Sequence, residues 1–191
     1  HNKTMQSKLR ILTFHHIQNN GAFLFAFSLT QLLQREFNNF DVKISAYKSR
    51  RLVIYDYLKR FKVFQKLPFF YMKRALMWGA EIERYLDLDQ DIPFFANEKT
   101  LQEYFAKKYD VLVIGMDVWC IVNGIERPKF PNIYWLPEKM PIPKIAYGVS
   151  AYNSDLHLIQ HSATQISNYL NDFDIIGVRD QFTYQLIQKY R

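Results

Sequence analysis

The segment Val-Leu-Val-Ile-Gly-Met-Asp at residues 111–117 carries the strongest strand signal in the chain. Its aliphatic residues follow one another without the polar alternation of a half-exposed strand. Uninterrupted apolar runs of this length are typical of strands buried on both faces, which occur in parallel sheets covered by helices. The segment therefore predicts a central strand of a parallel α/β sheet.

Similar apolar runs and amphipathic stretches alternate on both sides of this segment. Strands are expected at residues 9–14, 41–45, 111–114, 144–149 and 175–178. Helices are expected at residues 21–37, 101–105 and 156–170, and again after Asp180, a suitable N-cap. This alternation predicts an α/β fold, a Rossmann-like doubly wound parallel sheet.

The composition of the chain is that of a folded single domain. Of its 191 residues, 49% are hydrophobic and 23% are charged, which allows a sizeable core. Residues 1–5 are interpreted as a vector-derived or disordered start, and residues 6–191 as one domain with a basic helical segment at about 46–99. The one cysteine, Cys120, excludes an internal disulfide framework and favours a reducing, cytoplasmic location. No apolar run reaches the roughly 20 residues that span a bilayer.

The net charge of +7 is concentrated in residues 46–74, which hold nine basic residues and one acid, Asp56. Apolar residues recur within this segment at helical spacing. A basic amphipathic helix, here Lys48–Arg74, can bind an anionic membrane surface at the inner face of the membrane. The alternative is a solvated helix whose charges pair with a nearby acidic stretch. That stretch contains Glu81, Glu83, Asp87, Asp89 and Asp91. Basic charge without a recognition motif does not indicate nucleic-acid binding.

Several kinds of chemistry lack their sequence signatures. The first strand-to-helix turn has the single glycine Gly21, so neither a dinucleotide-binding nor a P-loop site is expected. The segment at residues 148–152 lacks the second glycine of a nucleophile elbow. His157 and His161 lie opposite the apolar face of their predicted helix and have no adjacent glutamate. They are therefore expected to face solvent, and no metal site is predicted.

Four segments resemble elements of one known family, and they occur in the same order. Residues 13–24 contain an Asn-x-Gly-Ala-x-Leu turn, here from Asn19 to Leu24, and residues 110–119 end a strand in a Gly-x-Asp loop near a tryptophan. Residues 144–150 contain an Ala-Tyr-x-x-Ser strand, and residues 173–180 run from a strand into Arg-Asp and a helix. The ordered set resembles the polysaccharide pyruvyl transferase family. Met116 stands where that family usually has serine.

The resemblance implies a fold and a reaction. Members of the family resemble two-domain glycosyltransferases of the B-type fold, and this chain would correspond to the N-terminal, acceptor-side half. Phosphoenolpyruvate would be the co-substrate, with no other cofactor. Its pyruvyl group would form a ketal on two hydroxyls of a glycan or lipid-linked sugar, a precursor in cell-surface glycan or exopolysaccharide biosynthesis. Much of the donor site would lie in the second half.

Candidate site residues follow from the rule that ligands bind beyond the carboxyl ends of parallel strands. Asp117 and Arg179 are the expected catalytic residues. The guanidinium of Arg179 suits a carboxylate or phosphate, although it could instead form a structural pair with Asp180 or another acid. Asp117 could accept the proton of a sugar hydroxyl, or could cap local backbone amides.

Further substrate-binding positions are expected at the same edge of the sheet. They are His15, His16, Asn20, Gly21, Trp119, Tyr147 and Ser150. Either histidine could titrate near neutral pH, and Asn20 and Gly21 are expected to shape the first turn. Trp119 could stack on a sugar or pack in the core.

Two other functions fit the same residues. One is half of a glycosyltransferase that uses a nucleotide-sugar, because a fold does not determine a reaction. The other is a degenerate transferase domain that serves as a non-catalytic interaction module.

Overall fold

The structure is a computed structural model, and it describes residues 6–48, 68–93, 97–124 and 127–191. Its centre is a six-stranded sheet in the order β3-β2-β1-β4-β5-β6, with every neighbouring pair parallel. The strands are β1 (Ser7–Leu12), β2 (Phe40–Ser45), β3 (Leu88–Asp89), β4 (Val111–Gly115), β5 (Lys144–Val149) and β6 (Ile175–Val178). This order confirms the predicted Rossmann-like doubly wound fold.

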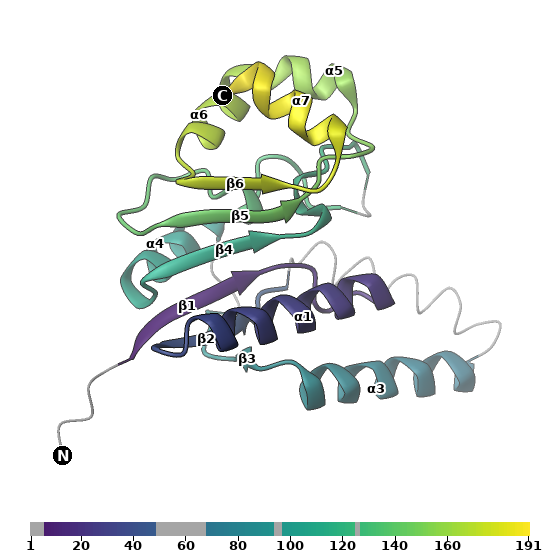
Figure 1. The fold of residues 1–191 in the computed structure, drawn as a ribbon. Helices are drawn as coiled ribbons and strands as arrows, with labels where there is room; N and C mark the ends of the chain where they lie inside the picture. The colour runs from purple at the N-terminus through teal and green to yellow at the C-terminus, as the bar shows by residue number, and fades with distance from the viewer. Residues whose placement is uncertain (1–5, 49–67, 94–96, 125–126) are drawn as a thin grey trace.

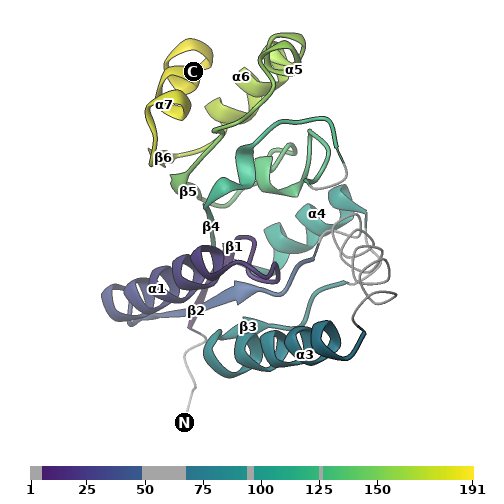
Figure 2. The same cartoon turned by 90° about the vertical axis from the view of Figure 1, so that its right-hand side faces the viewer.

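Helices cover both faces of the sheet, and Figure 2 shows α1 and α4 on opposite sides of β1. The helices are α1 (Asn20–Glu36), α3 (Pro68–Tyr85), α4 (Glu98–Lys108), α5 (Leu156–His161), α6 (Ala163–Asn171) and α7 (Gln181–Tyr190). Short 3-10 turns follow β4 at η1 (Asp117–Trp119) and precede β5 at η2 (Ile133–Trp135). Figure 1 shows α1 and α3 on the same side of the sheet, whereas α5, α6 and α7 lie beside β5 and β6.

The predicted strands are confirmed, whereas the single helix predicted at 156–170 is wrong. The chain leaves the helical conformation at Ser162 (φ −102°, ψ 11°), and its backbone N–H bonds the carbonyls of Leu158 and Ile159 at the end of α5. Ile159 and Ile166, on either side of this break, are both buried. The apolar residues keep their helical spacing across the break, so the sequence pattern alone does not reveal it. Of the basic helix predicted at Lys48–Arg74, residues 49–67 lie outside the described residues.

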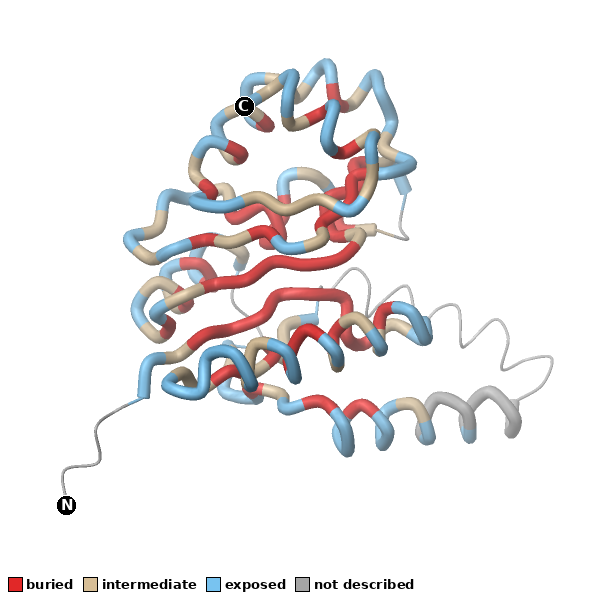
Figure 3. The backbone as a smooth tube through the Cα atoms, viewed as in Figure 1, coloured by how far each residue is buried: buried red, intermediate tan, exposed pale blue. Residues whose placement is uncertain are grey.

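Two apolar clusters lie on opposite faces of the sheet. One contains Leu12 and Ile114 together with α4, α5, α6 and α7 residues, and the other contains Ile11 and Val113 together with residues of α1 and α3. Successive residues of β1 and β4 therefore enter different clusters, as strands buried on both faces must. Figure 3 shows β1 and β4 as the most continuously buried strands.

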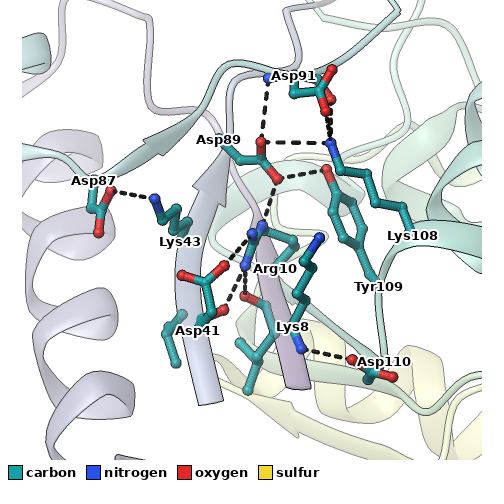
Figure 4. A network of polar contacts seen from close by, with 12 residues as sticks. Lys8, Arg10, Asp41, Lys43, Asp87, Asp89, Asp91, Lys108, Tyr109 and Asp110 are labelled. Carbon is teal, nitrogen blue, oxygen red and sulfur yellow. Dashed lines mark hydrogen bonds and ion pairs between the residues drawn. The ribbon is translucent and has the colours of Figure 1, made fainter. Parts of the chain in front are cut away.

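A buried charge network joins β1, β2, β3 and the end of α4 (Figure 4). Arg10 on β1 is 3% exposed, and its Nε and Nη2 atoms lie 2.7 Å from carboxylate oxygens of Asp89 and Asp41, respectively. The Tyr109 hydroxyl donates to the same Asp89 oxygen at 3.0 Å. Burial alone would raise the pKa of Asp89, but the Arg10 guanidinium outweighs burial and holds that pKa below its ordinary value. The network fixes the edge of the sheet that carries β2 and β3.

The acidic stretch has partners that the sequence did not indicate. Asp87 pairs with Lys43, Asp89 with Arg10 and Asp91 with Lys108. All three bases lie outside residues 46–74, so these pairs lend no support to the alternative in which the acids neutralise the basic segment. Most of that segment lies outside the described residues. Among the described helices, none is long and apolar enough to cross a membrane.

Candidate functional site

The candidate site lies where the strand order reverses. β1 and β4 are neighbours, but the chain continues from β1 toward β2 and from β4 toward β5, on opposite sides. Ligands of open α/β sheets bind outside the carboxyl ends of strands at this point. The loops after β1 and β4 are held together there, because the Thr13 hydroxyl donates to the Gly115 carbonyl at 3.2 Å.

The turn between β1 and α1 is organised by Asn19. Its side-chain oxygen accepts a hydrogen bond from the Ala22 amide at 3.1 Å and caps α1. Asn20 and Gly21 are the first two residues of the helix and directly follow this cap. A Cβ at position 21 would lie 3.2 Å from the Asn19 oxygen. Glycine there leaves room for the cap.

The loop after β4 leaves the strand in an unusual conformation. Met116 has φ 80°, a value that non-glycine residues rarely adopt, and its carbonyl accepts from the Ser150 amide at 3.0 Å. Gly115, the residue before it, lies against the Phe25 ring, which a Cβ would approach to 2.6 Å. The aromatic residue at position 25 therefore explains why β4 ends in glycine.

Asp117 and Arg179 form an ion pair between the loops that follow β4 and β6. Arg179 Nη2 contacts Asp117 Oδ1, and the two side chains are 48% and 30% exposed, respectively. Arg127 also reaches this place, because its Nη1 donates to the Asp117 carbonyl at 2.7 Å while its guanidinium lies 5.5 Å from the Phe14 ring centre. Two guanidinium groups thus flank Asp117, and solvent reaches both members of the ion pair.

Asp180 and Ser150 form hydrogen bonds that order the loops after β5 and β6. Asp180 accepts from the Thr183 amide at 2.8 Å and caps α7. Burial alone would raise the pKa of Asp180, but bonds from Thr183 and Ser150 hold it below its ordinary value. Ser150 is buried, and its hydroxyl also accepts from the Tyr152 amide at 3.1 Å. The structure therefore uses Ser150, predicted as a substrate contact, to join the loops after β5 and β6.

His15 and His16 lie side by side after β1, with ring centres 5.3 Å apart. They are 0% and 8% exposed. Burial lowers the pKa of His15 to about 4 and that of His16 to about 3, and the charge of Lys48 lowers both further. The expectation that either titrates near neutral pH is corrected, because both imidazoles are neutral there.

The two predicted aromatic contacts occupy different environments. Trp119 is fully buried, stacks on Trp135 at 4.9 Å between ring centres and donates its indole N–H to the Tyr134 carbonyl at 2.9 Å. Its faces are therefore covered by the core rather than open to a sugar. Tyr147 is 49% exposed on β5, where it is in register with Gly115 of β4.

Two basic residues near the candidate site, Arg127 and Lys48, were not predicted from the sequence to lie there. Arg127 lies in the long connection between β4 and β5, where no motif distinguishes it. Lys48 was assigned to the basic segment, yet its charge acts on both buried histidines. Lys48, Arg127 and Arg179 bring three positive charges to this part of the structure, where Asp117 and Asp180 bring two negative charges. Within the described residues, no three His, Cys, Asp or Glu side chains are grouped to hold a metal ion.

The comparison with family models identifies the group to which the chain is related. The model described as polysaccharide pyruvyl transferase matches residues 19–191. The chain belongs to the polysaccharide pyruvyl transferase family. No curated protein and no solved structure gave a match. For this polysaccharide pyruvyl transferase family member, the matched range includes Asp117 and Arg179 and begins after the two buried histidines.

Proposed function

We propose that this transferase moves the pyruvyl group of phosphoenolpyruvate onto two hydroxyls of a sugar in a cell-surface glycan precursor. The observation that carries this proposal is the solvent-accessible Asp117–Arg179 pair at the carboxyl edge of the sheet, in a chain of the pyruvyl transferase family. This edge would bind the acceptor sugar and one end of the donor.

The reaction balances without an oxidant or a reductant. A proton adds to the methylene carbon of phosphoenolpyruvate, and the two sugar hydroxyl oxygens form bonds to the adjacent carbon. The bond from that carbon to the phosphate oxygen breaks, and inorganic phosphate leaves. Of the two hydroxyl protons, one balances the proton taken up by the methylene carbon and the other leaves with phosphate.

Asp117 and Arg179 have complementary parts in this proposal. The Arg179 guanidinium offers two parallel N–H groups to a carboxylate or a phosphate, and in the free protein Asp117 occupies this fork. An anionic donor that binds Arg179 would release the Asp117 carboxylate to accept a hydroxyl proton. Arg127, which holds the Asp117 backbone, would keep the carboxylate in place and add positive charge.

An assay that compares two donors tests this function. The full-length protein is incubated with phosphoenolpyruvate and lipid-extracted glycan precursors of its source, and free phosphate and product masses are measured. We expect phosphate release that depends on the glycan, together with a product carrying a pyruvyl ketal. Nucleotide-sugars in place of phosphoenolpyruvate provide the control. Consumption of a nucleotide-sugar with phosphoenolpyruvate unchanged, or of neither donor, would overturn the proposal.

A further inference from the structure

Three imidazole nitrogens beside the candidate site are buried without a hydrogen-bond partner among the described residues. They are His15 Nε2, His16 Nδ1 and His16 Nε2. Leaving a polar group buried and unpaired is costly, and native proteins contain few such groups. Seven buried side-chain nitrogen or oxygen atoms lack a partner among the described residues, and three of the seven belong to these two adjacent histidines. This concentration of unpaired atoms points to a missing hydrogen-bond partner in the turn after β1.

The hydrogen bond made by His15 determines what its free nitrogen can do. His15 Nδ1 lies 3.3 Å from the Thr13 carbonyl oxygen, which can only accept. Nδ1 therefore carries the hydrogen. A neutral imidazole has one N–H group, so Nε2 presents a lone pair and requires a donor. Burial lowers the pKa of His15 to about 4, which keeps the ring in this neutral form at pH 7.

The surroundings restrict the kind of donor. An anion offers Nε2 no hydrogen, and the positive charge of Lys48, which acts on both histidines, disfavours an ammonium group. A metal ion would need further ligands, but no group of three ligating side chains exists in the described part of the chain. A neutral hydroxyl group, of a water molecule or of a sugar, satisfies these conditions, and the glycoside titration below distinguishes the two.

We propose that His15 is a binding residue for the acceptor, whose Nε2 accepts a hydrogen bond from a sugar hydroxyl, and that His16 completes the same subsite. This inference rests on the proposed function. The subsite lies in the turn between β1 and α1, and Thr13 joins that turn to the Gly115 carbonyl two residues before Asp117. Because His15 is 0% and His16 8% exposed in the free protein, this turn must open for a sugar hydroxyl to reach them, and the sugar would then extend toward the exposed ion pair.

Two substitutions of His15 distinguish the roles of its two ring nitrogens. His15→Asn places an amide N–H near Nδ1 and keeps the bond to Thr13, but it removes the Nε2 acceptor. His15→Gln places an amide oxygen near Nε2 and keeps an acceptor there. His161→Asn is the matched control, because His161 Nδ1 also contacts a backbone carbonyl, that of His157, at 2.9 Å, but on the exposed surface of α5.

The measurement is a ¹⁵N NMR titration of the full-length protein with methyl hexopyranosides. We expect the His15 Nε2 resonance of an unprotonated nitrogen at pH 7 and a saturable upfield shift as the glycoside is added. His15→Asn should weaken glycoside binding about tenfold, the loss of one hydrogen bond of about 1.4 kcal/mol. His15→Gln and His161→Asn should retain binding.

The subsite would be overturned by a protonated Nε2, by a resonance that glycosides do not move, or by wild-type affinity in folded His15→Asn. If His15→Asn fails to fold, the wild-type titration decides alone. The titration contains no phosphoenolpyruvate, so it is independent of turnover. A saturable shift without pyruvyl transfer would keep the subsite and refute the function. Transfer by His15→Asn with an unchanged acceptor KM would refute the subsite and keep the function.

Discussion

Acidification should destabilise the protein through its two buried histidines. In the unfolded chain an imidazole has a pKa near 6.5, whereas in the fold the values are about 4 for His15 and about 3 for His16. At pH values between about 4 and 6.5, the unfolded state binds protons that the native state does not. Stability is therefore fully present above pH 6.5 and is lost as the pH falls toward the native-state values.

The size of the effect follows from the same pKa values. At pH 5 the unfolded imidazoles are almost fully protonated and the native ones are mostly neutral, so each histidine removes about 2 kcal/mol, together about 4 kcal/mol. This is a large fraction of the roughly 5–15 kcal/mol that stabilises a typical domain. Carboxylates with a lowered pKa, such as Asp89 and Asp180, act only below about pH 4.5, because unfolded carboxylates protonate there.

Urea unfolding followed by tryptophan fluorescence at pH 7.5 and pH 5.0 measures this loss. His16→Phe keeps an aromatic ring without the titrating group, and it should reduce the loss to about half, about 2 kcal/mol. His161→Phe, at an exposed position of α5, is the control and should leave the loss unchanged. A wild-type free energy of unfolding that is equal at the two pH values would refute the assignment of neutral, buried histidines.

Two further pairs of substitutions test contacts in the fold, one beside the candidate site and one in the buried charge network. Gly115→Ala should lower the free energy of unfolding in urea by about 1–3 kcal/mol, because its Cβ would lie 2.6 Å from the Phe25 ring. Adding Phe25→Leu should recover part of this loss. Gly79→Ala is the control and should cost nothing, because no atom lies within 4 Å of its Cβ. Arg10→Met should cost about 3–5 kcal/mol by leaving buried carboxylates unpaired, and adding Asp89→Asn should restore part of it. Additive effects in either pair would contradict these contacts.

The central strands could be predicted because their environment is uniform. The run at 111–114 is apolar without alternation, and the structure buries it between two clusters. β3 could not be predicted, because its two residues, Leu88 and Asp89, show no period. The burial of Arg10 could not be predicted, because only the partners Asp41 and Asp89, distant in sequence, make it favourable.

The residues at the strand ends could be predicted from the sequence, whereas the contacts between them could not. Asp117 and Arg179 were each expected at strand ends, but their pairing across 62 residues depends on the order of β4, β5 and β6. Arg127 was missed because it comes from a loop without a periodic pattern. Ser150 and Trp119 were expected among the substrate contacts, with packing in the core as the stated alternative for Trp119. The structure buries both side chains.

The most direct test of the central claim is the turnover of Asp117→Asn and Arg179→Gln in the phosphoenolpyruvate-dependent assay. Arg35→Gln is the control, because Arg35 forms an exposed ion pair with Glu36 on α1, far in sequence from both loops. If the pair serves proton transfer and charge stabilisation, kcat should fall about 10²-fold or more in each variant, with unfolding free energies near the control value. Turnover equal to that of Arg35→Gln would place the reaction elsewhere and contradict the account.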